Sequence, residues 1–460
     1  MGTTYDVRFW KTEVYEGKRE TTHYVRWVVA GKPLREGFKT KALAESFRSE
    51  LVAAARRGEA FDIVSGRPVS MQRTERDMPW YEFACAFVDV KWPHVAATTR
   101  RTNAEALTAV TTAMFATDRG KPDDRVIRSA LCRWGFNTKR RDDPECPEEV
   151  RAALRWIAAH TRPVSSLADP EILRPVLDSL AVRLDGKPYA SSVVSRRRKI
   201  FGTAAEYAVE RKILAVNPIP ALKRKALPKV LQVVDRRVVA NPVQVRTLLD
   251  AVRAQQRSGP RLVAFFGCLY FAALRPEEGV ALRENNLAIP AEGWGELHLE
   301  RAEPHAGKDW TDNGQNRDRR QLKQRAVGEV RSVPCPPELT ALLREHLDTF
   351  GTAPDGRLFL GERNHGELPK LTIVRAWQRA RAEVFTPEVA AGPLAATPYD
   401  LRHAAVSTWL NGGVPSTTVA EWAGHSVEIL HKIYAKCLDG EAAALRQRVQ
   451  AALGHPGRAG

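Results

Sequence analysis

An arginine in the second half of the chain stands where a helix is predicted to begin. Arg275 follows an apolar stretch that ends at Leu274, and Pro276 with two acidic residues comes directly after it. Backbone N–H groups and the dipole of a helix N-terminus attract anions, and a planar guanidinium group suits phosphate oxygens. Taken alone, Arg275 is better explained as a surface residue paired with Glu278.

A second arginine, Arg402, is predicted in the first turn of another helix. Thr397 and Asp400 form a capping-box pattern, with Pro398 between them at the first helical position. Tyr399 lies three residues before Arg402, so the two side chains are predicted to share one face of this helix. A helix start fixed in this way gives Arg402 a defined direction, which favours a binding role.

The third candidate site combines a histidine with a tyrosine. Gly424 is predicted to end one helix and Ser426 to begin the next, with His425 between them. Tyr434 lies on that second helix, nine residues after His425, and a tyrosine hydroxyl can act as a nucleophile. The helical spacing of Tyr434 from apolar neighbours is also typical of a core residue, and for this tyrosine alone that reading is favoured.

The net charge indicates a polyanionic partner. The 460 residues include 71 lysines and arginines against 54 acidic residues, a formal net charge of +17. Nucleic acid is the commonest polyanion, although a merely basic surface would give the same count. The six cysteines lack the spacing of a zinc site or a disulfide framework, and no apolar run is long enough to span a bilayer. We therefore expect a cytoplasmic protein without a metal site or a membrane partner.

The length favours two or three domains. Residues 1–65 predict a three-stranded sheet with one helix, residues 77–225 read as helical, and residues 238–460 mix helices with strand-like segments. A basic stretch at 223–237 has few helical cues and is predicted to be an interdomain linker. The predicted fold class is multidomain and mainly α with small β-sheets.

Local signals place individual elements within this outline. Residues 5–10 and 24–29 are strand-like, and Thr40 is expected to cap a helix that ends at Gly58. Asn241, followed by proline, predicts a further helix start. Strands are also expected near 296–300 and 330–333.

Four consecutive cations occur in a helix predicted over residues 190–214. Positive charge in the N-terminal half of a helix opposes the helix dipole unless anions lie nearby, and DNA phosphates would supply them. A charged face in water is the alternative. The residues predicted to bind DNA are Arg196, Arg197, Arg198 and Lys199.

The order and spacing of the three candidate sites resemble the signature of the tyrosine recombinase (phage integrase) family, as found in integrases of phages or integrative elements of high-GC bacteria. The resembling motifs are Arg275 with Glu278 and Leu282, Asp-Leu-Arg-His at 400–403, Gly-His at 424–425, and Tyr434. The segment from Leu322 through Pro334 is similar to the family's β-hairpin lysine segment and contains Lys323. Upstream, residues 77–225 resemble the helical core-binding (SAM-like) domain, and residues 1–65 resemble the arm-type DNA-binding domain.

The resemblance implies DNA cleavage and rejoining through a 3′-phosphotyrosine. Arg275 and Arg402 would clamp the phosphate oxygens, and His425 would donate a further hydrogen bond. Lys323 would protonate the leaving 5′ oxygen, and Tyr434 would attack phosphorus. This chemistry needs no cofactor.

One position departs from the family pattern. The family usually has a histidine where this chain has Tyr399. A tyrosine hydroxyl can donate a hydrogen bond to the same phosphate without bringing a charge. We therefore include Tyr399 among the expected catalytic residues.

The implied partners are double-stranded DNA attachment sites, bound by a homotetramer that integrates a mobile element. An excisionase and a host DNA-bending protein are further candidate partners. Two alternatives remain: a type IB topoisomerase-like enzyme and a non-catalytic DNA-binding regulator descended from a recombinase. The arm-domain resemblance argues against the first, and the intact set of site residues argues against the second.

Overall fold

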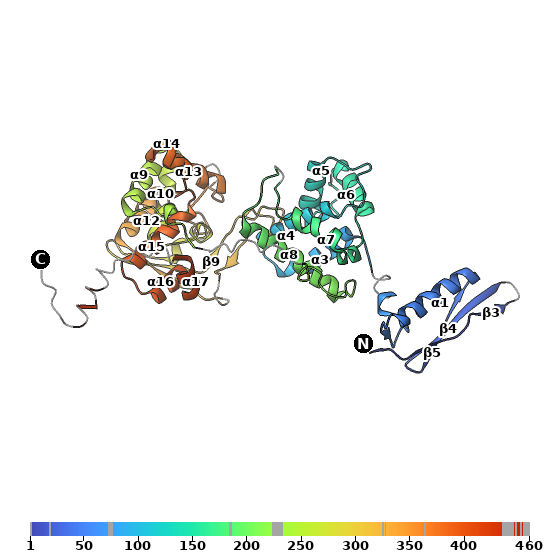
Figure 1. Cartoon of the computed structure of the whole chain (residues 1–460). Coiled ribbons are helices and arrows are strands. Elements are labelled where there is room, and N and C mark those ends of the chain that lie inside the picture. The colour runs from blue at the N-terminus through green and yellow to red at the C-terminus, as the bar shows by residue number, and fades with distance from the viewer. Residues whose placement is uncertain are drawn as a thin grey trace. The chain divides into compact units, whose positions relative to one another are not determined.

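The computed structural model describes residues 2–17, 20–71, 77–183, 186–222, 233–323, 326, 328–362, 365–434, 446, 449–450 and 453. The chain divides into two compact units, Met1–Pro228 and Lys229–Gly460. The boundary falls within the predicted linker at 223–237, of which residues 223–232 lie outside the described part. Both units consist mainly of helices with small sheets (Figure 1), which confirms the predicted fold class. A further division of the first unit between residues 65 and 77 stays a prediction.

A small antiparallel sheet opens the first unit. Its strands are β2 (Val7–Phe9), β3 (Glu13–Glu16), β4 (Thr21–Val29) and β5 (Lys32–Phe38). The long strand β4 pairs with β5 on one side and with both β2 and β3 on the other. The sheet has four strands and not the predicted three, because two short strands, β2 and β3, pair with successive stretches of β4. Ala30 and Gly31 connect β4 to β5 with positive φ angles of 47° and 78°, as a type I′ hairpin requires. A separate two-stranded ladder joins β1 (Thr3–Thr4) to β6 (Phe61–Asp62).

Helix α1 (Lys41–Arg56) lies along one face of this sheet (Figure 1). The Thr40 hydroxyl accepts a hydrogen bond from the Leu43 backbone at 3.3 Å, as the cap prediction requires. Inward residues alternate along β4 because successive strand side chains point to opposite faces. The residues buried between sheet and helix are Val25, Trp27, Val29, Ala44, Leu51 and Ala54.

The rest of the first unit is helical. Its helices are α3 (Trp80–Lys91), α4 (Ala97–Ala113), α5 (Asp124–Ala130), α6 (Glu148–His160), α7 (Pro170–Ser179) and α8 (Ser191–Glu210). Trp80 packs edge-on against Phe201 of α8, with ring centroids 5.8 Å apart. Helix α8 was predicted to reach residue 214, which is wrong by four residues. It ends earlier because Lys212 takes a positive φ of 61°, which interrupts the helical backbone.

The second unit is built around a buried helix. Its helices are α9 (Pro242–Arg253), α10 (Ser258–Phe271), α11 (Pro276–Gly279), α12 (Pro337–Phe350), α13 (Lys370–Val384), α14 (Pro387–Ala391), α15 (Tyr399–Asn411), α16 (Ser416–Ala423) and α17 (Val427–Tyr434). Asn241 and Gln244 form a reciprocal capping box at the start of α9, which confirms the predicted cap. Helix α10 is buried from Leu262 to Phe271, so it forms the centre of the core.

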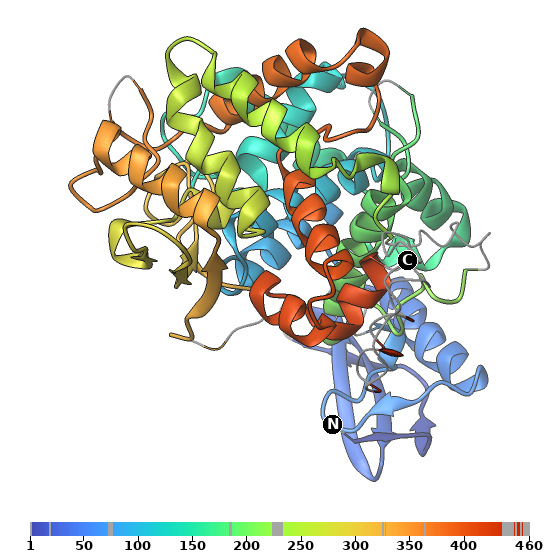
Figure 2. The same ribbon diagram turned by 90° about the vertical axis from the view of Figure 1, so that its left-hand side faces the viewer.

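Two small sheets lie in the same unit. Their strands are β7 (Leu287–Ala288), β8 (Gly295–Leu299) and β11 (Arg331–Cys335) in one, and β9 (Arg301–Ala302) and β10 (Arg320–Gln321) in the other. The antiparallel β8–β11 pair, with Leu297 opposite Val333, confirms the two strands expected in this region. Helices α15, α16 and α17, drawn in red, lie together in both views (Figures 1 and 2). No helix in the described part of the chain is long and apolar enough to cross a membrane.

Candidate active site

Arg275 lies at the start of α11, as predicted, but it is buried. Its side chain is 6% exposed, so the alternative of an ion pair on the surface is wrong: Arg275 does pair with Glu278, but in the interior. The Glu278 carboxylate accepts hydrogen bonds from the Arg275 backbone N–H at 2.8 Å and from its Nη1 at 2.7 Å. The carboxylate thus holds the guanidinium group inside the unit.

A second arginine, Arg331, binds the other side of the same carboxylate. Its Nη1 and Nη2 donate to Glu278 at 3.0 and 2.7 Å, and its side chain is fully buried. Arg331 was not among the predicted site residues. The available signal was its place in β11, where it alternates with the buried Val333 and Cys335 and therefore points inward.

Arg402 is the most deeply buried of the predicted residues, with an exposed fraction of 0%. Its guanidinium group donates to the backbone carbonyls of Ala273 and Ala423 and to Nε2 of His425, the last at 2.9 Å. These bonds connect the end of α10 to the end of α16. The arginine therefore holds together the two segments that carry the candidate site.

Two of the three guanidinium groups bind the same carboxylate, and the third, of Arg402, lies within electrostatic reach of it. Burial alone would raise the pKa of Glu278, but Arg331 and Arg275 hold it well below its usual range, so the group stays ionised. Burial and the neighbouring Arg275 lower the pKa of Arg402 to about 10, which leaves it charged at neutral pH. Three arginines and one carboxylate leave two uncompensated positive charges. Buried charge without a partner is costly, so this cluster is suited to receive an anion.

Two of these arginines also have unused donors. The Nε groups of Arg331 and Arg402 are buried and have no hydrogen-bond partner among the described residues. Buried donors are nearly always paired in proteins. Their presence beside the excess charge supports the same conclusion, that the cluster accommodates an anionic group.

Gly424 allows the arginines to approach each other. It ends α16 in the left-handed conformation, with φ at +63°, and its carbonyl accepts a hydrogen bond from Nη2 of Arg275 at 2.8 Å. A Cβ atom added at this position would overlap the guanidinium group of Arg331. The glycine predicted as a helix end thus also provides space within the cluster.

Gly424→Ala is therefore expected to destabilise the protein by about 1–3 kcal/mol, because it combines an unfavourable φ with an overlap. Urea unfolding measures the change. Gly293→Ala is the matched control, since Gly293 has a positive φ of +93° but open space around its Cβ position. Equal effects of the two substitutions would show that the packing against Arg331 contributes nothing.

His425 lies between α16 and α17, as predicted, in contact with Arg402. Because Nε2 accepts the Arg402 hydrogen bond, the ring proton is carried by Nδ1. Burial and then the adjacent Arg402 and Arg275 lower the pKa of His425 to about 3, so the ring is neutral at pH 7. A neutral His425 retains one N–H donor, which is what hydrogen bonding to an anion requires.

Tyr434 is the last described residue of α17 and is 1% exposed. Its hydroxyl lies 2.9 Å from Nδ1 of His403, and its ring centroid lies 6.2 Å from that of His425. The Ser426 hydroxyl accepts from the Ile429 backbone at 3.2 Å, which confirms the predicted helix start. Tyr434 thus has the burial of a core tyrosine together with a polar partner for its hydroxyl.

His403 is the second residue that the sequence prediction left out, although it belongs to the Asp-Leu-Arg-His motif. It lies one helical turn after Tyr399, and the ring centroids of this pair are 5.1 Å apart. Tyr399 is half-buried and lies within electrostatic reach of both Arg275 and Arg402. A signal was present in the sequence, because residues 399 and 403 share a helix face.

Lys323 is not brought into this cluster by any described interaction. It is exposed, just after β10, and makes no hydrogen bond or ion pair with a described residue. Its neighbours at 324, 325 and 327 lie outside the described part of the chain. The expected role of Lys323, protonation of the leaving 5′ oxygen, therefore stays a prediction that rests only on the family resemblance.

The four cations predicted to bind DNA lie on α8, in the other unit. Arg196 and Lys199 are exposed, whereas Arg197 and Arg198 are half-buried. Arg197 donates to the Tyr189 hydroxyl at 3.0 Å and lies 4.1 Å above the ring of that residue. Within the run, Arg196 and Lys199 are the residues that present their charge to solvent.

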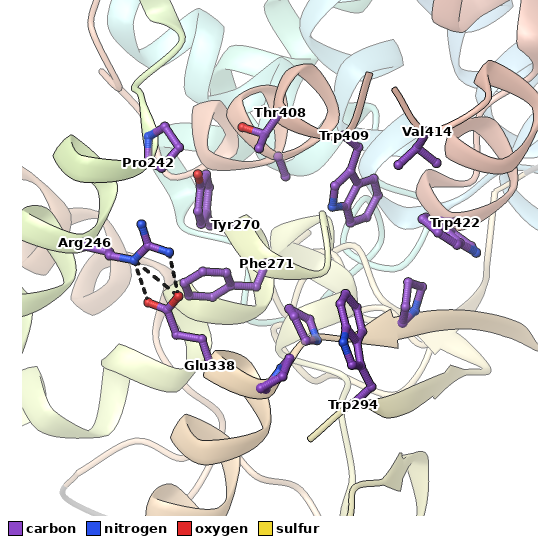
Figure 3. A pocket seen from close by; sticks show the side chains of 14 residues that line it. Pro242, Arg246, Tyr270, Phe271, Trp294, Glu338, Thr408, Trp409, Val414 and Trp422 are labelled. Carbon is purple, nitrogen blue, oxygen red and sulfur yellow. Dashed lines mark hydrogen bonds and ion pairs between the residues drawn. The ribbon is translucent and has the colours of Figure 1, made fainter. Parts of the chain in front are cut away.

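A cavity of about 540 Å³ lies elsewhere in the second unit (Figure 3). Aromatic side chains, including Tyr270, Trp409 and Trp422, line it, and an exposed ion pair joins Arg246 to Glu338 at its rim at 2.8 Å. None of the predicted site residues lines this cavity. Among the described residues there is also no group of three histidine, cysteine or acidic side chains that could hold a metal ion.

No family model matches the sequence, and no curated protein matches it. Solved structures do match the fold at low identity. The integrase of transposon Tn1549, in complex with a circular intermediate DNA, is 14% identical, and the match covers 67% of this chain and 96% of that one with a TM-score of 0.48. The recombinase XerH bound to its difH substrate is 13% identical, covering 76% and 95% of the two chains, with a TM-score of 0.43. A lambda integrase dimer bound to a COC′ core site is 12% identical over 93% of this chain and 94% of that chain, with a TM-score of 0.47.

Proposed function

We propose that this protein is a site-specific DNA recombinase that cuts and rejoins DNA through Tyr434. The observation that supports the proposal most directly is the buried, net-positive arginine cluster. Its Arg402 bonds to His425, and the Tyr434 ring lies 6.2 Å from the ring of that histidine. A phosphodiester resists attack because its oxygens are negative and its leaving alkoxide is poor. Fixed cations on the oxygens and a proton for the leaving group lower that barrier.

Each residue has a defined task in this proposal. Arg275 and Arg402 bind the non-bridging oxygens, and the Nδ1–H of His425 donates a further hydrogen bond. Tyr434 forms a 3′-phosphotyrosine, and Lys323 supplies the proton to the leaving 5′ oxygen. Because the phosphotyrosine conserves the energy of the broken ester, rejoining needs no ATP. Glu278 orients Arg275. The buried Arg331, which binds the same carboxylate, adds a further positive charge to the cluster.

We further propose that the protein acts on double-stranded attachment sites as a homotetramer and integrates a mobile element. The helical segment at 77–225 and the unit from about 238 would grip the crossover site, and residues 1–65 would contact more distant arm sites. An excisionase or a DNA-bending protein would set the direction of the reaction.

Incubation with nicked suicide substrates tests the proposal. The duplexes carry the junction sequences that flank the gene, and a scrambled duplex of equal length serves as the control. A covalent adduct on the junction DNA alone, seen on a denaturing gel, supports the recombinase. An adduct on both duplexes supports a type IB topoisomerase-like enzyme, and binding without any adduct supports a non-catalytic regulator.

Arg196→Ala and Lys199→Ala are expected to weaken DNA binding uniformly across sequences. Each removes one exposed cation, so the slope of log K against log[salt] should fall in magnitude by about 1. Titration at several salt concentrations measures the slope. Arg155→Ala is the control, because Arg155 on α6 is 66% exposed and already paired with Glu148. Unchanged slopes for both α8 variants would remove this helix from the proposed DNA surface.

A further inference from the structure

The hydroxyl of Tyr434 has a histidine, His403, as a hydrogen-bond partner. Nδ1 of His403 lies 2.9 Å from Oη, and the two ring centroids are 5.7 Å apart. The contact joins α15 to the end of α17, so it is a tertiary contact between helices. A neutral imidazole can accept a hydroxyl proton through one of its ring nitrogens.

The surroundings of His403 fix its ring in this position. Tyr399 packs on it from the preceding turn, and Tyr434 packs on it from α17. The residue next to it in the chain, Arg402, is anchored to two backbone carbonyls and to His425. Because its neighbours are anchored in this way, His403 is held where it can orient the hydroxyl.

We propose that His403 is the general base of the cleavage step, taking the hydroxyl proton of Tyr434 through Nδ1 as that oxygen attacks phosphorus. This inference rests on the proposed function. It adds a catalytic residue, because His403 touches the reacting oxygen itself.

The Tyr434 Oη–H bond breaks and its proton passes to Nδ1 of His403, while a bond forms between Oη and phosphorus. The bond between phosphorus and the 5′ oxygen breaks with its electron pair on that oxygen, which takes a proton from Lys323. Rejoining reverses each transfer, so His403 returns its proton to Tyr434.

The charge state of His403 agrees with this role. Burial and then the adjacent Arg402 lower the pKa of His403 to about 4, so the ring is neutral and able to accept a proton at pH 7. The titratable and charged side chains that interact with the His403 ring are those of Arg402, Tyr399, Tyr434 and His425. A DNA phosphate bound to the arginines offsets their charge, which raises the basicity of the imidazole when the substrate is in place.

Single-turnover cleavage of suicide substrates by the full-length chain tests the inference. His403→Phe removes the base and is expected to slow cleavage by about 10²-fold or more, the range for loss of a general base. His403→Asn can still accept a hydrogen bond but is not basic, so it should remain within about tenfold of the Phe variant. His431→Asn is the control with unchanged rate, since His431 is exposed on the same helix as Tyr434.

A second substrate distinguishes a role of His403 as the general base from a role as the general acid. With sulfur in place of the bridging 5′ oxygen, the leaving thiolate needs no proton, so the defect of His403→Phe should persist. Restoration of its rate by sulfur would place His403 on the leaving group and overturn the inference. A wild-type rate in His403→Asn would also overturn it, and that variant decides the matter if the Phe variant does not fold. Absence of an adduct with the unaltered chain would instead refute the proposed function, which keeps the two failures distinct.

Discussion

Tyr434→Phe is expected to abolish the covalent protein–DNA adduct while binding to the site stays within a few-fold. The substitution removes the nucleophilic oxygen but keeps the ring, which is buried at the end of α17. Affinity for DNA depends mainly on phosphate contacts made by many residues, so the loss of one hydroxyl changes it little. Gel electrophoresis under denaturing conditions measures the adduct, and a mobility shift under native conditions measures binding.

A matched substitution separates chemistry from folding. Tyr270→Phe also removes the hydroxyl of a buried tyrosine in the same unit, where it interacts with Thr408 near the aromatic cavity. Adduct formation by Tyr270→Phe should be close to wild type. An adduct that persists in Tyr434→Phe would show that another residue is the nucleophile.

Glu278→Ala is expected to reduce the free energy of unfolding by about 3–5 kcal/mol, because it leaves Arg275 and Arg331 buried without a counter-charge. Urea unfolding measures the loss. The control is Glu338→Ala, whose partner Arg246 is 51% exposed, so the change there should be at most about 1 kcal/mol. A Glu278 variant as stable as the Glu338 variant would contradict the description of the cluster.

The effect of Glu278 should depend on pH in a defined direction. The two arginines hold the pKa of this carboxyl well below its usual value, so the stabilisation is present above the unfolded-state pKa of about 4.3. It is lost as the pH falls through the folded-state pKa. The difference in stability between wild type and Glu278→Ala should therefore be constant from pH 7 to about 5 and shrink below about pH 4. A stability difference between wild type and Glu278→Ala that grows as the pH falls would contradict this prediction.

Local elements were predictable because their causes are local. Thr40 and Asn241 cap their helices with hydrogen bonds to residues a few positions along the chain. The turn at Gly31 and the left-handed Gly424 also follow from residue type. The end of α8 was misplaced because nothing in the sequence required the positive φ of Lys212.

The candidate site was predictable in its motif residues but not in their partners. Arg275, Arg402 and His425 come together as expected, because helix starts and ends place them. Arg331 and His403 were not predicted, because each meets its partner through a tertiary contact. Arg331 reaches Glu278 from 53 residues away, and His403 reaches Tyr434 from 31 residues away. Pairings of this kind depend on packing, which residue spacing along one helix does not determine.

The central claim, that Tyr434 becomes joined to DNA, is tested most directly by locating the covalent bond. The adduct formed on a suicide substrate is digested with a protease and a nuclease, and the peptide that retains a nucleotide is sequenced by mass spectrometry. We predict a 3′-nucleotide on the tyrosine of the peptide that contains Glu428 to Tyr434. A nucleotide on any other residue, or binding of junction DNA without a modified peptide, would contradict the account.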